Sequence, residues 1–260
     1  MPVIESYENG TPSWVDLSTT DPDGAKDFYH ALFGWEFTDE PAGEQGIYTM
    51  ARLGGNSAAG MMRQAPEQAA MGIPPLWNTY ITSYDIEDTL GKVEGAGGSV
   101  MVPTIDVMEA GRMAVIVDPT GAVVALWEPK AHIGCEVVNE PGALVWNELM
   151  TSEISVAKSF YEQVFGWSTE SADMPDGGVY TMFQLGDQPI AGVMAPPEAG
   201  IPPAWGVIFS VADCGAALET VTENGGTVLD GPIDIGVGTL GIVMDPQGTV
   251  FQLMQAADEV

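Results

Sequence analysis

Residues 14–35 read WVDLSTTDPDGAKDFYHALFGW, and residues 146–167 read WNELMTSEISVAKSFYEQVFGW. Both stretches begin and end with tryptophan, and the pair Phe28-Tyr29 recurs as Phe160-Tyr161 at an offset of 132 residues. A fixed offset between such distinctive residues indicates an internal duplication. The chain of 260 residues therefore contains two homologous halves.

Shorter motifs repeat along both halves in the same order. They are Tyr-Thr-Met at 48–50 and 180–182, glycine at 60 and 192, Ile-Pro-Pro at 73–75 and 201–203, and Asp-Pro-x-Gly at 118–121 and 245–248. The offset drifts from 132 to 128 and then to 127, as short insertions and deletions in loops would produce. We predict a first domain over residues 10–128, a polar linker over 129–140, and a second domain over 141–257.

Each domain also repeats internally, because four segments begin with tryptophan and continue as a strand and then a helix. They start at Trp14, Trp77, Trp146 and Trp205. In the first segment the alternation predicts a half-buried strand, with Trp14 and Asp16 on one face and Val15 on the other. Short strands follow each helix. The predicted fold is α+β, with four βαβββ units that form mixed sheets.

The charge of the chain restricts its partners. Seven Lys and Arg residues against 37 Asp and Glu give a net charge of −30, which repels nucleic acid backbones and anionic membranes. The N-terminal stretch does not resemble a signal peptide, and no apolar run reaches the roughly 18–20 residues of a membrane span. We therefore expect a cytoplasmic protein with a small-molecule ligand, without nucleic acid or membrane partners, and either monomeric or homodimeric.

The four βαβββ units, the helix ending FYxxxFGW and the DPxG turn before a last strand together resemble the vicinal-oxygen-chelate superfamily. That superfamily includes glyoxalase I, bleomycin-resistance proteins and extradiol dioxygenases. More narrowly, the chain resembles a two-domain actinobacterial subgroup often labelled glyoxalase/bleomycin-resistance protein or "hydroxylase". The resemblance implies two tandem domains, each with two βαβββ units that form cupped mixed sheets. One fold of this kind hosts many chemistries, so the resemblance does not fix the reaction.

Metal-dependent members of the superfamily have four ligand positions per domain, and the resemblance places them on this sequence. The positions fall at Trp14, Gly60, Thr79 and Ala125 in the first domain and at Trp146, Gly192, Val207 and Gln252 in the second. Only Gln252 offers an oxygen that suits a divalent ion, which needs several converging ligands. We therefore expect neither a metal nor another cofactor, and no metal-dependent glyoxalase or ring-cleaving activity.

Tryptophans replace the metal ligands on the predicted concave faces. We assign Trp14, Trp77, Trp127, Trp146 and Trp205 to these faces as candidate ligand-binding residues, together with Gln252. Indole rings supply area, stacking and one hydrogen-bond donor, which suits a flat and partly apolar ligand. The alternative is that these side chains only fill the cups as core.

Asp16 and Glu148 occupy equivalent positions, two residues after the first tryptophan of each domain. A carboxylate in an aromatic cup has a raised pKa and can act as a general base, so both residues are candidate catalytic groups. The alternative is that each carboxylate accepts hydrogen bonds and orders its cup. The same alternation points Asn78 and Asn147 toward the helices, which makes them structural.

Arg112 is the one cation that we predict near a pocket, where it would bind an anionic ligand. Its alternative role is a surface ion pair with Asp106 or Glu109. His132 falls in the linker, where we expect no contact with a ligand.

Three functions remain open from the sequence. The first is a metal-independent lyase, isomerase or hydroxylase that uses Asp16 or Glu148 on a carbonyl or aromatic metabolite. The second is a non-catalytic protein that sequesters a ligand or antibiotic, and the third is a scaffold.

Overall fold

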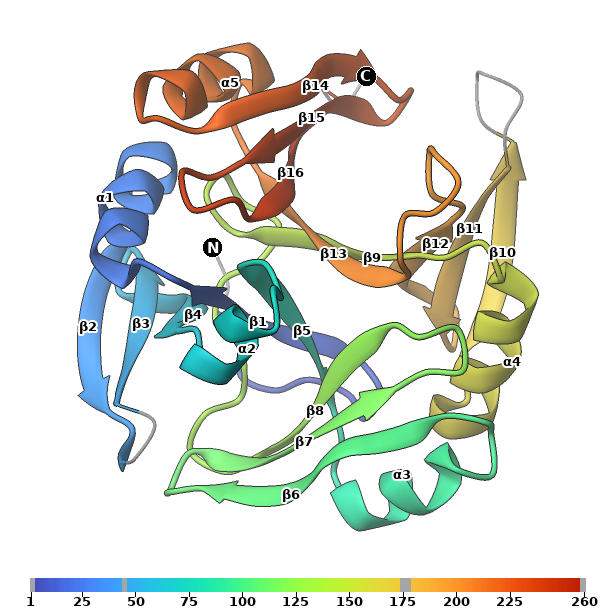
Figure 1. The fold of residues 1–260 in the computed structure, drawn as a ribbon. Helices are drawn as coiled ribbons and strands as arrows, with labels where there is room; N and C mark the ends of the chain where they lie inside the picture. Colours follow the sequence, from blue (N-terminus) through green and yellow to red (C-terminus); the bar gives the residue numbers. More distant parts are fainter. Residues whose placement is uncertain (1–2, 44–45, 174–178, 258–260) are drawn as a thin grey trace.

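The computed structural model describes residues 3–43, 46–173 and 179–257 (Figure 1). The elements of the first half are β1 (Pro12–Thr19), α1 (Pro22–Phe33), β2 (Glu36–Pro41), β3 (Ile47–Leu53), β4 (Asn56–Arg63), α2 (Pro66–Ala70), β5 (Leu76–Thr82), α3 (Ile86–Val93), β6 (Ser99–Val107), β7 (Gly111–Val117) and β8 (Val123–Pro129). Those of the second half are β9 (Leu144–Met150), α4 (Ile154–Phe165), β10 (Ser168–Asp173), β11 (Val179–Leu185), β12 (Gln188–Met194), β13 (Ala204–Ser210), α5 (Cys214–Glu223), β14 (Thr227–Asp234), β15 (Gly238–Met244) and β16 (Val250–Ala256). The predicted βαβββ unit therefore occurs four times.

Each half forms one eight-stranded mixed sheet. The strand orders are β2-β3-β4-β1-β5-β8-β7-β6 and β10-β11-β12-β9-β13-β16-β15-β14. The first strands of the two units, β1 and β5 or β9 and β13, are antiparallel neighbours at the centre of each sheet. Each of these strands is also parallel to the last strand of its own unit. The predicted α+β fold with two tandem domains is confirmed.

The repeated FYxxxFGW motif forms the helix of the first unit in each domain. Pro22 lies in the first turn of α1, where its missing N–H costs no hydrogen bond, and Gly34 ends the helix in the left-handed region with a φ of 71°. The buried face of α1 carries Phe28 and Tyr29, which pack against the sheet. The local sequence therefore sets both the length of the helix and its buried side.

The two sheets pack with their helix-bearing faces toward each other. Strand β5 lies against β13, helix α1 against α5, and helix α3 against α4 (Figure 1). Between the sheets, the Thr79 hydroxyl donates to Oδ1 of Asn147 over 2.9 Å, and both residues are buried. Because the sheets share this core, their concave faces, the cups, are directed away from it.

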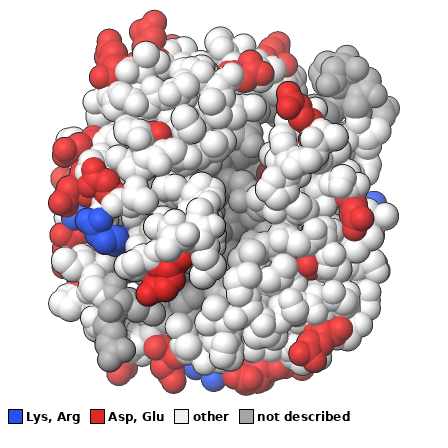
Figure 2. Space-filling view, viewed as in Figure 1, with Lys and Arg blue, Asp and Glu red and all other residues white. Residues whose placement is uncertain are grey.

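Acidic side chains are spread over the molecular surface and far outnumber basic ones on the face shown in Figure 2. Among the described residues, no helix combines the length and the apolar character that crossing a bilayer requires.

Candidate functional site

A tryptophan, a tyrosine and a carboxylate are joined by hydrogen bonds on the concave face of the first sheet. The indole N–H of Trp14 donates to the Tyr48 hydroxyl over 3.0 Å, and that hydroxyl donates to Oδ2 of Asp16 over 3.2 Å. Trp14 and Asp16 are neighbours on one face of β1, and Tyr48 reaches them from β3.

The second sheet repeats the arrangement with shorter distances. Trp146 donates to the Tyr180 hydroxyl over 2.9 Å, and Tyr180 donates to Oε2 of Glu148 over 2.7 Å. We call each Trp–Tyr–carboxylate chain a relay. The repetition shows that the duplicated sequence preserves a side-chain arrangement as well as a backbone fold.

A glycine makes room for the tyrosine in each relay. Gly60 pairs with Asp16 across β4 and β1, and Gly192 pairs with Glu148 across β12 and β9. A Cβ atom on either glycine would collide with the hydroxyl of Tyr48 or Tyr180. The resemblance placed metal-ligand positions at these glycines. Here the space above each glycine holds the tyrosine hydroxyl.

Asp16 is buried among three hydrogen-bond donors. It is 2% exposed and accepts from Asn78 Nδ2 over 2.8 Å and from the Tyr80 hydroxyl over 2.8 Å, in addition to Tyr48. Burial raises the pKa of the Asp16 carboxyl, while the three donors lower it. Three neutral donors around one carboxylate are the arrangement expected if Asp16 orders its cup.

Glu148 has a less complete set of partners. It is 6% exposed, and burial raises the pKa of its carboxyl, while the side chains of Tyr180 and Gln252 lower it. Ile208 pairs with Trp146 at the register position where Tyr80 pairs with Trp14, so the counterpart of the Tyr80 hydroxyl is missing. A buried carboxylate with a raised pKa and spare acceptor capacity is suited to accept a proton.

The predicted directions of the Trp77, Trp205 and Asn78 side chains are wrong. Trp77 pairs with Leu17 and Trp205 pairs with Leu149, so both indoles lie on the helix-bearing faces, where they donate to the hydroxyls of Tyr29 and Tyr161. Asn78 consequently lies on the cup side, opposite Asp16. The prediction aligned Trp77 with Trp14, but the antiparallel pairing of β1 and β5 sets the phase instead.

Thr79 and Val207 follow the same phase and face the shared core instead of the cups. Asn147 does point to the helix side, as predicted. The ligand positions that the resemblance assigned to Thr79 and Val207 are therefore not on a concave face.

Arg112 does not approach a cup. Its guanidinium forms two hydrogen bonds with the Glu128 carboxylate, of 2.9 and 2.6 Å, and Glu128 also accepts from the backbone N–H of Ile86 at the start of α3. The ion-pair alternative describes this arrangement, although the partner is Glu128 and not Asp106 or Glu109.

Trp127 lies in the first cup, where its indole N–H donates to the backbone oxygen of His132 over 2.8 Å. The His132 ring meets the Trp14 ring edge-on, with 4.4 Å between ring centroids, and lies 5.7 Å from the Trp127 ring. The linker therefore enters the first cup, which its sequence did not predict.

The family model for the "Glyoxalase/Bleomycin resistance protein/Dioxygenase superfamily" matches residues 11–126 and 132–253. The chain belongs to this superfamily. It is 43% identical over 261 residues to "Putative glyoxylase CFP32" of Mycobacterium tuberculosis, which covers 100% of both proteins. It is also 34% identical to "Anthracycline biosynthesis protein DauV" of Streptomyces sp. (strain C5), over 96% of this chain and 94% of the relative.

Solved structures of the superfamily share the fold. The 2,3-dioxygenase LapB from Pseudomonas sp. KL28 superposes with a TM-score of 0.66 at 15% identity, over 96% of this chain and 94% of LapB. The Mn(II)-bound glyoxalase from Novosphingobium aromaticivorans gives a TM-score of 0.65 at 16% identity, over 98% and 85% of the two chains.

The donor groups of the cups do not fit a divalent metal centre of the superfamily type. In the part of the chain that the structure describes, no three His, Cys, Asp or Glu side chains lie together as a possible metal site. The buried carboxylate of each cup, Asp16 or Glu148, is surrounded by hydroxyl, amide and indole groups that already bond to it or to one another. A divalent ion needs several anionic or neutral ligands converging on one point.

Tyr48, Tyr80 and Tyr180, like His132, lie in the cups although the sequence did not single them out as site residues. The repeated Tyr-Thr-Met motif and the repeated glycines carried the signal, because a tyrosine and a glycine recurred together on adjacent strands. That signal covers Tyr48 and Tyr180 but not Tyr80, whose direction depends on the pairing of β5 with β1.

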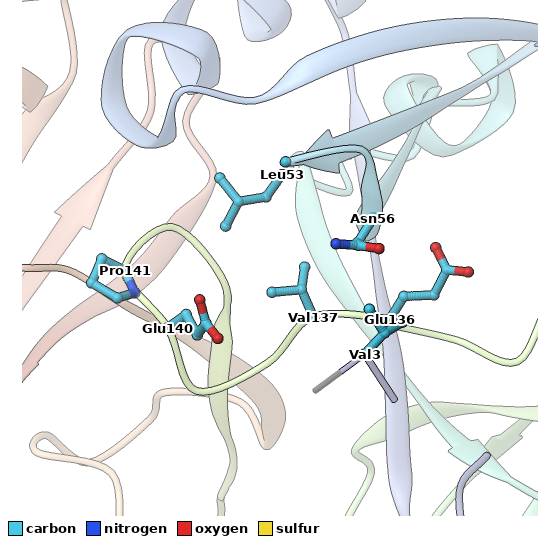
Figure 3. Close-up of a pocket in the computed structure, with 8 residues that line it drawn as sticks. Val3, Leu53, Asn56, Glu136, Val137, Glu140 and Pro141 are labelled. Carbon is cyan, nitrogen blue, oxygen red and sulfur yellow. The ribbon is translucent and has the colours of Figure 1, made fainter. Parts of the chain in front are cut away.

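A separate pocket of about 280 Å³ lies outside both cups (Figure 3). It is lined by Val3, Leu53, Gly54, Asn56, Glu136, Val137, Glu140 and Pro141. The Glu136 carboxylate is already bound there, since it accepts from the backbone N–H of Ser57 over 2.7 Å. None of the predicted site residues contributes to this pocket.

Proposed function

We propose that the protein binds a small aromatic or carbonyl-containing metabolite in a tryptophan-lined cup and acts on it with a cup carboxylate, without a metal. The observation that carries this proposal is the relay Trp146–Tyr180–Glu148, which holds a buried carboxylate with a raised pKa on a concave face. Asp16 is its counterpart in the first cup. The alternative function is a non-catalytic protein that sequesters a ligand or antibiotic.

The ligand class follows from the lining of the cup and from the relatives. Trp146, Met182 and Met254 are partly exposed and give the second cup apolar side chains, next to the polar groups of Glu148 and Gln252. Such a lining suits a planar ring system that carries ketone or phenol groups. The relatives named for anthracycline biosynthesis support a polycyclic aromatic ligand of this kind.

The chemistry that fits these groups is a proton transfer. The Glu148 carboxylate accepts a proton from a carbon next to a ketone, and the electrons of that C–H bond form the double bond of an enolate. Return of the same proton at another atom completes an isomerisation, or expulsion of a β-hydroxyl as water completes a dehydration. Tyr180 and Gln252 both form hydrogen bonds with the Glu148 carboxylate and hold it in place.

Glu148→Gln and Asp16→Asn test the proposal together. Tryptophan fluorescence follows binding of a panel of hydroxylated quinones and ketones, and chromatography with mass detection follows their conversion. The proposal predicts binding by both variants and loss of turnover in at least one of them, by about 100-fold or more. Unchanged turnover in both variants contradicts a carboxylate mechanism. Tight binding without turnover in the wild-type protein supports the sequestering function instead.

A further inference from the structure

The linker crosses the mouth of the first cup and is bound there along its length. The backbone N–H groups of Lys130 and His132 both donate to the oxygen of Ala110 in the β6–β7 turn. Cys135 then donates from its backbone to Ser13 at the start of β1, and Glu136 donates to Ser57 at the start of β4. The segment 130–136 is therefore attached to three strands or turns of the first domain.

His132 is the side chain that this segment places in the cup. Its ring lies between Trp14 and Trp127, and its buried Nε2 has no hydrogen-bond partner among the described residues. A planar, weakly polar ring against two indoles is the arrangement expected of an aromatic ligand in such a cup.

Equivalent positions in the two cups differ in exposure. Trp14 is 3% exposed and Met50 is 7% exposed, whereas Trp146 and Met182 are partly exposed. In β8, Ala125 and Trp127 are buried, whereas their counterparts in β16, Gln252 and Met254, are partly exposed. The backbone N–H of Ala257, directly after β16, donates to Val237 as that of Lys130 donates to Ala110. No described segment fills the second cup as residues 130–136 fill the first.

We propose that only the second cup binds the ligand, and that the linker occupies the first cup as an internal substitute for a ligand, with His132 in the ligand's place. The inference rests on the proposed function and assigns it to one domain. The hydrogen bonds of the carboxylates agree with this assignment, because Asp16 accepts from Tyr48, Asn78 and Tyr80, whereas Glu148 bonds with Tyr180 and Gln252 and lacks a counterpart of the Tyr80 hydroxyl.

Hydroxyl-radical footprinting tests the occupancy of the cups without any ligand. The matched pairs Trp14 with Trp146 and Met50 with Met182 act as controls for each other within one protein. We expect Trp146 and Met182 to be oxidised at least several-fold faster than Trp14 and Met50. In His132→Ala we expect the oxidation rate of Trp14 to rise while that of Trp146 stays unchanged. Equal rates at the paired positions in the wild-type protein would overturn the inference.

Calorimetric titration with quinizarin, a neutral dihydroxyanthraquinone, then locates binding. Its neutrality avoids non-specific attraction to a chain of charge −30. We expect one site per chain, with affinity reduced at least tenfold in Trp146→Ala and unchanged in Trp14→Ala. In His132→Ala we expect a second site.

The outcomes separate the two proposals. Two sites in the wild-type protein, or loss of binding in Trp14→Ala alone, would overturn the inference and leave the proposed function standing. If neither quinizarin nor any compound of the panel binds, the proposed function fails, and footprinting still decides whether the first cup is filled.

Discussion

The hydroxyl of Tyr29 in the first domain lies 3.0 Å from Oδ2 of Asp245 in the second domain and donates a hydrogen bond to it. The duplicated contact joins Tyr161 to Asp118 over 3.1 Å in the opposite direction. All four residues are buried, so each DPxG turn is held by the FYxxxFGW helix of the other domain. The two motifs that identify the superfamily in this sequence therefore meet at the domain interface.

Removing one of these hydroxyls should loosen the interface. We expect Tyr29→Phe to lower the free energy of unfolding by about 1–3 kcal/mol, because it leaves a buried carboxylate oxygen and the Trp77 N–H without that partner. Chemical denaturation measures the effect. Tyr84→Phe is the matched control, since Tyr84 is 60% exposed, and should cost less. An equal loss in both variants would contradict the role of the Tyr29–Asp245 bond.

Much of this architecture was predictable from the chain alone. The offset of the repeats gave two domains and four βαβββ units, and alternation in one strand placed Trp14 and Asp16 correctly on the concave face. These features depend on local periodicity and on the duplication, which a sequence carries directly.

The errors arose where strand pairing or long-range contacts decide the outcome. The phase of β5 depends on its pairing with β1, which inverted the predicted directions of Trp77 and Asn78. Glu128 became the partner of Arg112 because β7 and β8 pair in register. The position of His132 depends on how a linker folds back, and no periodic pattern encodes that path.

Glu148→Gln should stabilise the protein at neutral and alkaline pH. Burial raises the folded-state pKa of Glu148 above its unfolded value, so the ionised carboxylate opposes folding at pH values above the folded-state pKa. As the pH falls through that pKa, the folded state takes up the proton and the penalty disappears. We therefore expect a gain in unfolding free energy at pH 8 that shrinks as the pH falls toward 4.

Asp16→Asn is the comparison variant for the unfolding free energy of Glu148→Gln. Asn at this position presents an N–H₂ group to one of three donors that now point at the carboxylate, so it should lower the free energy of unfolding. A stabilising Asp16→Asn or a destabilising Glu148→Gln at pH 8 would contradict the different roles assigned to the two carboxylates.

Gly192→Ala should disrupt the second relay. The new Cβ would collide with the Tyr180 hydroxyl and displace it from Trp146 and Glu148. We expect quinizarin affinity to fall by about tenfold or more, as measured by fluorescence quenching, in line with the loss of one or two hydrogen bonds. Gly60→Ala makes the same collision with Tyr48 in the first cup and should leave the affinity unchanged. A reversed pattern would place the ligand in the first cup.

His132 should make the stability of the protein sensitive to acid. Burial is the main cause that lowers the pKa of His132 from 6.5 to about 4. The nearby Glu136 raises this pKa, and Arg52 lowers it further. The unfolded chain therefore binds a proton between pH 6.5 and 4 that the folded protein excludes, and stability falls as the pH falls through this window.

The size of that effect is read from the difference between the wild-type protein and His132→Gln. We expect the wild-type protein to lose on the order of 2 kcal/mol more than the variant between pH 7 and pH 4 in urea titrations. Parallel curves for the two proteins would show that His132 is not buried in the first cup.

The central claim, that the Trp146–Tyr180–Glu148 cup binds the ligand, is tested most directly by fluorine NMR of protein labelled with fluorotryptophan. The chain has seven tryptophans, and single Trp→Phe variants assign their resonances. Addition of quinizarin should shift the resonance of Trp146 and leave those of Trp14 and Trp127 in place. Shifts confined to Trp14 and Trp127, or no shift at Trp146 under saturating ligand, would contradict it.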